Sequence, residues 1–314
     1  MPSRYQAALP LVLLVGCSSG TTAPQQPPGS TYDFTQALDN TVGQVIEPTY
    51  EELHEAALEL QSAADALKET PTEDKLQATR DAWVKARRRW EQSEAFLFGP
   101  VASLGIDPSI DSWPVDRVQL DQVLASRLAL TAESLSKNFG GGLRGFHTLE
   151  YLLWGAEDAK QATAFTERPR ELDYLLAAAA ALVQDSDTAL TAWTEEGGYG
   201  AAFAASGTPD GLYARQSDAV QQLLNGMIEI CDEVANGKIA DPFKAQDRSL
   251  EESQFSHNSI RDFADNLRSV KFIYQGARGD IASADSLSAF VRAQDAALDE
   301  RLNAEIDDAI EAIE

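Results

Sequence analysis

Residues 145–155 read GFHTLEYLLWG, and this stretch predicts a short helix over residues 143–154 that Gly155 ends. Side chains three and four positions apart share one face of a helix, so His147 lies beside Glu150, and the same face continues through Tyr151 and Trp154. The flanks of this face are apolar, which predicts that the helix is buried. A buried charge needs a partner or a metal ion.

The histidine–glutamate pair fits two interpretations. Imidazole and carboxylate groups are both good ligands of divalent transition metals. Helical bundles with carboxylate-bridged metals use Glu-x-x-His, the same geometry in reverse order, whereas the sequence does not match the His-Glu-x-x-His pattern of the zincins. Alternatively, His147 is a structural histidine that is hydrogen-bonded to Glu150. The pair alone leaves both open, and a metal site needs further ligands from elsewhere in the chain.

Helical periodicity extends outward from this stretch in both directions. One helix starts after Thr72 and ends near Gly99-Pro100, and another spans residues 249–275. Residues 99–114, GPVASLGIDPSIDSWP, form a long connection, and such loops in compact domains are often functional. No segment shows the alternating pattern of a strand bounded by turns.

The predicted fold is therefore all-α, with about eight to ten helices. That is too many for one four-helix bundle, so we expect two packed helical bundles. The N-terminal half covers residues 32–160 and carries the histidine–glutamate pair, and the C-terminal helical half covers residues 161–314.

The first residues predict export. Residues 1–17 combine Arg4, a short apolar run and the sequence LVGC, which resembles a bacterial lipobox with Cys17 as the lipidated residue. An ordinary signal peptide cut nearby is the alternative. Residues 18–31 are rich in Ser, Thr, Pro and Gln and are expected to form a tether. Ser18 after the cysteine favours a protein that is lipid-anchored to the outer membrane and faces the periplasm.

The charge balance excludes some partners. The chain carries 25 basic and 50 acidic residues, a formal net charge of −25. Nucleic-acid binding needs a basic surface, and so does charge-driven binding to anionic lipids. We therefore expect no nucleic-acid partner, whereas an acidic surface is compatible with cations.

Further ligand candidates are few. Glu91 and Glu94 lie at the end of one predicted helix, and Asp111 lies in the long connection, where the Trp113-Pro114 pair after it restricts the backbone. The remaining candidates are Asp107 and Asp116 near that connection, and His257 and Asp262 in the second half.

Four segments in order resemble the imelysin family. GFHTLEYLLWG is similar to its Gly-x-His-x-x-Glu signature, and WEQSEAFLFGP, DSWPVD and ESQFSHNSIRDFADNLRSVKFIYQG are similar to three further family segments. The resemblance implies an exported or lipid-anchored bacterial protein with two helical-bundle halves and the signature near their interface. It places Gly145, His147 and Glu150 in the signature. The other family segments contain Glu94, Asp111, Trp113, Ser256, Asn258 and Asp262.

The family includes a founding member classed as a metallopeptidase and relatives in iron acquisition, so the resemblance implies two functions. The first is binding of iron, zinc or another metal ion, or of a metal complex, by His147, Glu150, Glu94 and Asp111, with an iron-uptake receptor or permease as a partner. The second is a metallopeptidase that uses His147 and Glu150. A non-catalytic protein-interaction module is a third interpretation, in which the pair is structural.

Overall fold

The structure is a computed structural model that describes residues 32–156 and 160–314. The predicted signal peptide, Cys17 and the whole of the tether lie outside the described residues. Within them every regular element is a helix, which confirms the all-α prediction. None of the described helices is long and apolar enough to span a membrane. Residues 33–314 form one compact unit.

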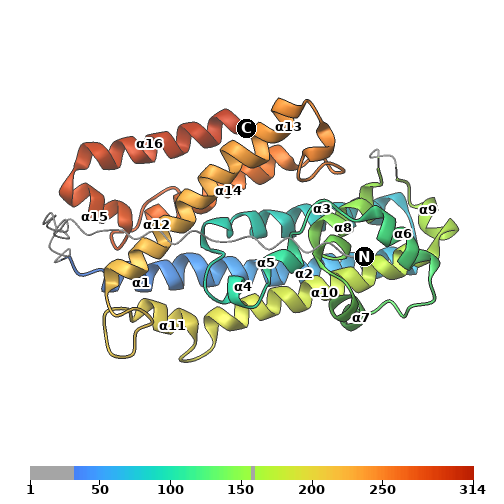
Figure 1. Ribbon diagram of the computed structural model, residues 1–314, viewed down its shortest axis with the longest axis horizontal. Helices are drawn as coiled ribbons and strands as arrows, with labels where there is room; N and C mark the ends of the chain where they lie inside the picture. Colours follow the sequence, from blue (N-terminus) through green and yellow to red (C-terminus); the bar gives the residue numbers. More distant parts are fainter. Residues whose placement is uncertain (1–31, 157–159) are drawn as a thin grey trace, which may run out of the picture. The chain divides into compact units, whose positions relative to one another are not determined.

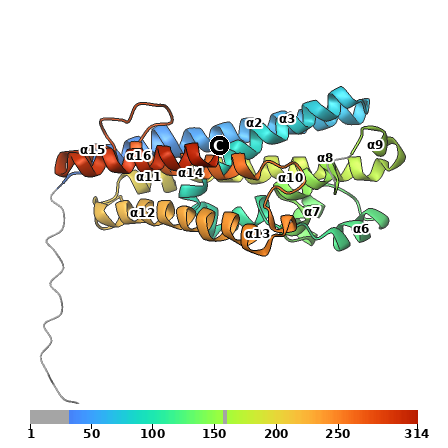
Figure 2. The same ribbon diagram turned by 90° about the horizontal axis from the view of Figure 1, so that it is seen from above.

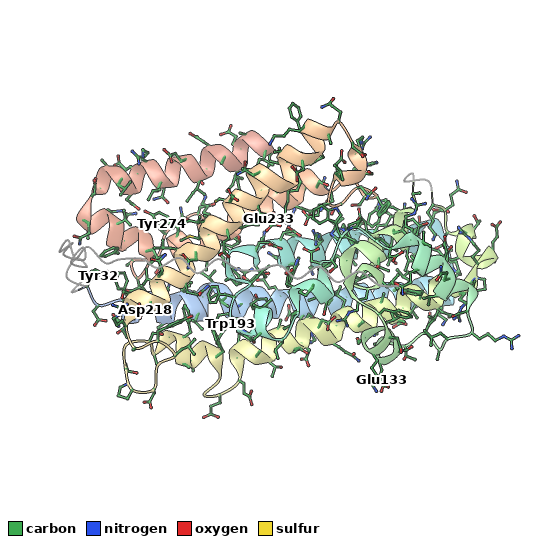
Figure 3. All side chains as sticks on the ribbon, viewed as in Figure 1. Tyr32, Glu133, Trp193, Asp218, Glu233 and Tyr274 are labelled. Atoms are coloured by element: carbon green, nitrogen blue, oxygen red, sulfur yellow. The ribbon has the colours of Figure 1, made fainter. Side chains whose placement is uncertain are left out.

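The first group of helices contains α2 (Glu47–Glu69), α3 (Glu73–Glu91), α8 (Gly145–Trp154) and α10 (Pro169–Thr194). Helix α2 packs against both α3 and α10, and α8 packs against α3 and α10 (Figure 1). Aromatic side chains join these helices, since Trp193 of α10 stacks on Tyr50 of α2 with ring centroids 6.3 Å apart. Figure 3 labels Trp193 among the side chains. This packing buries the apolar faces that the periodicity predicts.

The second group contains α12 (Gln216–Asp232), α14 (Ser259–Gln275), α15 (Leu287–Gln294) and α16 (Ala296–Ile313). Helix α14 packs against α12, α15 and α16 (Figure 2). It also contacts α3 of the first group, so the two groups share a buried interface. This arrangement confirms the two packed bundles. The boundary at residues 160 and 161 stays a prediction, and α10, which follows it in the chain, packs with the first group.

Short elements complete the chain. They are α1 (Thr35–Thr41), α4 (Pro100–Ser103), α5 (Asp107–Ile110), α6 (Arg117–Ala125), α7 (Ala132–Asn138), α9 (Thr163–Glu167), α11 (Tyr199–Ala204) and α13 (Ala240–Ala245). Single 3₁₀ turns cover Glu94–Phe96, Gly141–Leu143 and Arg248–Leu250, and π-helical segments cover Val42–Ile46 and Glu233–Ile239. The connection 99–114 therefore contains two short helices, and Asp111 follows the second of them directly.

The predicted helix 249–275 is wrong in its first ten residues, because α14 begins only at Ser259. Residues 251–258, called the capping segment below, form turns instead. Their backbone donors find partners outside a helix: the amide of Ser253 donates to the Ser259 hydroxyl, and those of Phe255 and Ser256 donate to Glu150. A segment whose N–H groups are satisfied by tertiary contacts gains little from helix formation.

Candidate metal centre

Gly145 begins α8 with a positive φ of 78°. A Cβ atom at this position would lie 2.1 Å from the carbonyl oxygen of Ile110, far inside van der Waals contact. Glycine is therefore the residue that lets the end of α5 lie directly against the start of α8. Because Asp111 follows Ile110 in the chain, this close approach places the Asp111 carboxylate beside His147.

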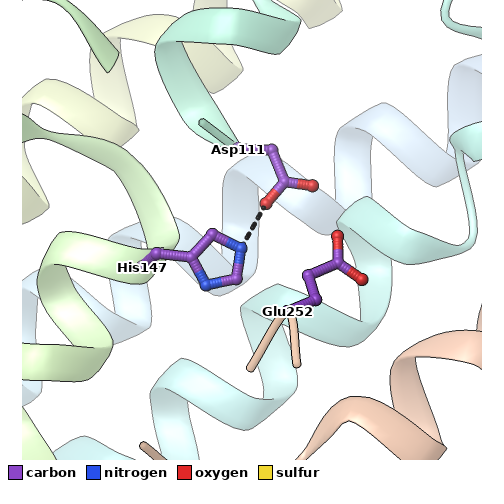
Figure 4. A group of neighbouring side chains, drawn as sticks. All are labelled: Asp111, His147 and Glu252. Carbon is purple, nitrogen blue, oxygen red and sulfur yellow. Dashed lines mark ion pairs between the residues drawn. The ribbon is translucent and has the colours of Figure 1, made fainter. Parts of the chain in front are cut away.

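The His147 imidazole is 1% exposed and lies between two carboxylates. Its Nε2 atom lies 3.1 Å from Oδ1 of Asp111, and its Nδ1 atom lies 3.1 Å from Oε2 of Glu150. Figure 4 marks the first of these ion pairs by a dashed line. The contact with Glu150 has hydrogen-bond geometry, whereas Nε2 lacks a well-aligned hydrogen bond. The ring is thus held through Nδ1, and Nε2 faces the acidic groups.

Glu150 joins α8 to the capping segment. Its Oε1 atom accepts three hydrogen bonds, from the amides of Phe255 and Ser256 at 2.9 and 2.7 Å and from the Ser256 hydroxyl at 2.8 Å. Its Oε2 atom is the partner of His147. Histidines that bind metals usually donate their other ring N–H to such a carboxylate. Both oxygens of Glu150 are committed, so this residue is suited to orient His147 rather than to bind an ion itself.

A buried arginine connects the acidic groups around His147. Arg87 of α3 is fully buried, and its Nη2 atom lies 2.6 Å from Glu91 and 3.1 Å from Glu252. Its Nη1 atom contacts Asp111, and its Nε atom lies 3.7 Å from Asp262. One guanidinium therefore touches carboxylates from α3, the α5 connection, the capping segment and α14.

Lys238 is the second buried cation of this cluster. Its ammonium group lies 3.1 Å from Glu252 and 3.9 Å from Glu91. The carboxyl groups of the cluster outnumber its three basic groups, Arg87, Lys238 and His147, because they comprise Glu91, Glu94, Asp111, Glu150, Glu252 and Asp262. The excess of acid makes the centre attractive for an additional cation.

Burial and pairing move the protonation equilibria in different directions. Burial raises the pKa of Glu91 and of Glu94 well above the usual value, and raises that of Asp262 to about 6. Burial also opposes ionisation of Asp111, but Arg87 and His147 outweigh it and hold the pKa of Asp111 below its usual range. An incoming cation would therefore displace protons from Glu91 and Glu94, whereas Asp111 is already ionised.

His147 has its pKa raised to about 9. Burial and the nearby Arg87 lower this pKa, but the close contacts with Asp111 and Glu150 and the charge of Asp111 outweigh both. The imidazole therefore carries a proton at neutral pH, which a metal ion at Nε2 would have to replace.

Two sets of side chains offer donor atoms that lie within 4.8 Å of one another. The first set is Asp111, His147 and Glu252, and the second is Glu91, Glu94 and Asp111. Three of these side chains hold a buried atom without a hydrogen bond within the described structure, namely Nε2 of His147, Oε1 of Glu91 and Oε2 of Glu252. Imidazole nitrogen and carboxylate oxygen suit iron and zinc, so the donors fit such an ion.

The structure brings together most of the residues that the sequence singles out. Asp111, His147 and Glu150 meet directly, and Glu94 lies beside Asp111. In the second half, Ser256 donates to Glu150, and Asn258 donates to Asp262 at 2.7 Å. Trp113, by contrast, has an exposed side chain.

Three central residues are missing from the sequence prediction: Arg87, Lys238 and Glu252. For Arg87 a signal exists, because it stands four residues after Trp83 and three before Trp90 and so shares their buried helix face. Lys238 and Glu252 lie in a π-helical segment and in a turn, where no periodicity indicates which side chains are buried.

Fold and site together define a class: an all-helical protein of two packed bundles with a buried histidine–carboxylate centre at their interface. The chain belongs to the imelysin family, peptidase family M75, whose model matches residues 46–314. Its relatives include "Iron-regulated protein A" of Synechococcus elongatus, 28% identical over 281 residues that cover 88% of this chain and 74% of the relative.

Two solved structures show the same fold. One is a protein from Parabacteroides distasonis assigned as an iron-regulated protein A precursor, with a TM-score of 0.82, 29% identity, and coverage of 92% of this chain and 87% of the other. The second is an imelysin-like protein from Psychrobacter arcticum, with a TM-score of 0.69, 17% identity, and coverage of 89% and 83%. The latter supports the fold alone.

Proposed function

We propose that this protein binds iron or another divalent metal ion in its buried centre and serves in iron acquisition. Asp111, His147 and Glu252 form the primary ligand set, with Glu91 and Glu94 beside it. The observation that carries the proposal is the Nε2 atom of His147, which is buried and lies 3.1 Å from Oδ1 of Asp111, in a cluster whose carboxyl groups outnumber its basic groups. The iron-regulated names of two relatives support an iron-related role.

A metallopeptidase is the second candidate, and the family name favours it. Metal-assisted hydrolysis needs an open coordination position that both water and a peptide bond can reach. His147 and Glu150 are at most 1% exposed, and both oxygens of Glu150 are hydrogen-bonded. This burial suits retention of an ion better than access of a polypeptide. A peptidase would show cleavage that a chelator and His147→Ala abolish.

The decisive experiment is calorimetric titration of the chain lacking residues 1–17 with zinc and, under anaerobic conditions, with ferrous iron. We expect one tight site in the wild type and a loss of affinity of more than about 100-fold in His147→Ala. Glu150→Gln should lose about 10–100-fold, the usual effect of removing an outer-shell partner of a ligand.

His54→Gln is the matched control, because His54 lies on α2 and contacts Ser186 rather than the cluster. Its affinity should equal that of the wild type. Absence of binding by the wild type would overturn the proposal and leave the cluster as an ion-pair network that holds the bundles together, as the protein-interaction interpretation requires.

The proposal extends to location. The lipobox-like sequence supports a lipoprotein that is anchored through Cys17 to the outer membrane, where an iron-uptake receptor or permease would be the partner. Expression of Cys17→Ala in the native host tests it, because this variant should leave the membrane fraction while the wild type stays there. Equal membrane association of both would exclude the lipid anchor.

A further inference from the structure

Arg87 contacts most of the carboxyl groups that a metal ion would need. The two primary carboxylate ligands are both partners of its guanidinium, Asp111 through Nη1 and Glu252 through Nη2 at 3.1 Å. Glu91 of the second donor set is bound to the same Nη2 at 2.6 Å. Three of the five proposed ligands, Glu91, Asp111 and Glu252, therefore already form ion pairs with Arg87.

The guanidinium cannot give way by losing its proton. Arginine stays charged at every relevant pH, and its surroundings raise the pKa of Arg87 further, because the attraction of Asp111 and Glu91 exceeds the effect of burial. A divalent ion that shares Asp111 and Glu252 with Arg87 would lie close to a like charge in a buried place, where screening by water is weak. Binding of the ion to these two carboxylates therefore competes with their contacts to Arg87.

We propose that Arg87 is a resident counter-cation, which the metal ion displaces from Asp111 and Glu252 and which sets the affinity of the site. This inference rests on the proposed metal binding. Two contacts of the guanidinium do not involve the proposed ligands and can be kept during the exchange, because Asp262 lies 3.7 Å from Nε and the Phe146 ring lies 5.4 Å from the guanidinium carbon. The exchange keeps the carboxylates neutralised without the metal, and makes a buried ion releasable when the arginine returns.

The test compares zinc binding by the wild type, Arg87→Met and Arg88→Met. Arg88 is the matched control, because it is the neighbouring residue on α3 and its replacement by methionine removes the same single positive charge. Its side chain is 54% exposed, so this charge is lost outside the buried cluster. We expect Arg87→Met to bind zinc at least about tenfold more tightly than the wild type, and Arg88→Met to bind like the wild type. Zinc should also raise the Tm of Arg87→Met more than that of the wild type, since the ion replaces the missing cation.

A folded Arg87→Met that binds zinc equally or more weakly would overturn the inference while leaving the proposed function intact. Binding by Arg87→Met alone would support the inference and overturn metal binding by the native protein. Binding by neither would overturn both.

If Arg87→Met does not fold, nitrogen-15 spectra of the wild type give the answer, with the Arg87 side-chain Nε–H signal assigned by its loss in Arg87→Lys. A shift of this signal at zinc saturation supports displacement, and an unchanged signal contradicts it.

Discussion

Replacing Gly145 with alanine is expected to lower the free energy of unfolding by about 3 kcal/mol or more. Two costs add. Alanine is strained at a φ of 78°, and its Cβ atom would lie 2.1 Å from the carbonyl oxygen of Ile110. Relief of this clash must move the end of α5 away from α8, and Asp111 moves with it. The same variant should therefore also weaken zinc binding, because Asp111 no longer lies beside His147.

Gly105→Ala is the matched control for this prediction. Gly105 also has a positive φ, of 65°, but no atom lies within 4 Å of the position of an added Cβ. It should show the backbone cost alone, on the order of 1 kcal/mol, and unchanged zinc affinity. Urea unfolding followed by circular dichroism measures both variants. Equal losses in the two would show that the contact between Gly145 and Ile110 does not position the site.

The helix at the centre of the site is predictable from sequence because its signals are local. The apolar flanks around His147 and Glu150 predict burial, and Gly155 predicts the end of the helix, where the structure places it. Asp111 is predictable as a candidate because it stands in a long connection rich in proline and glycine. Its contact with His147 is not, since this depends on how α5 packs against α8.

Arg87 and Glu252 show where sequence reasoning ends. The position of Arg87 on the same helix face as Trp83 and Trp90 indicates burial, but only the assembled bundles show that four acidic side chains surround it. Glu252 lies in a segment whose helical periodicity is overridden, because Glu150 and Ser259 take the backbone donors that a helix would use. Both residues owe their role to contacts between distant parts of the chain.

Zinc affinity is expected to rise about tenfold for each pH unit between pH 6 and 8. The reason is the pKa of His147, which its carboxylate partners raise from 6.5 to about 9 against the effects of burial and Arg87. Throughout this range the imidazole must lose a proton before Nε2 can bind the ion. Calorimetry in two buffers of different ionisation enthalpy should therefore show release of about one proton per zinc ion at pH 7.5, and more if Glu91 or Glu94 is a ligand.

Stability without metal should change in the opposite direction. The pKa of His147 is higher in the folded chain than the unfolded value of 6.5, so the protonated ring stabilises the fold fully below pH 6.5 and loses this effect as pH rises through about 9. The contribution is on the order of 3 kcal/mol. Urea unfolding at pH 6.5 and 9 should show this loss in the wild type and in His54→Gln, but not in His147→Gln. Flat zinc affinity together with a flat stability profile would mean that His147 is neutral in the folded protein, and that its Nε2 atom is free for a metal ion without any exchange of protons.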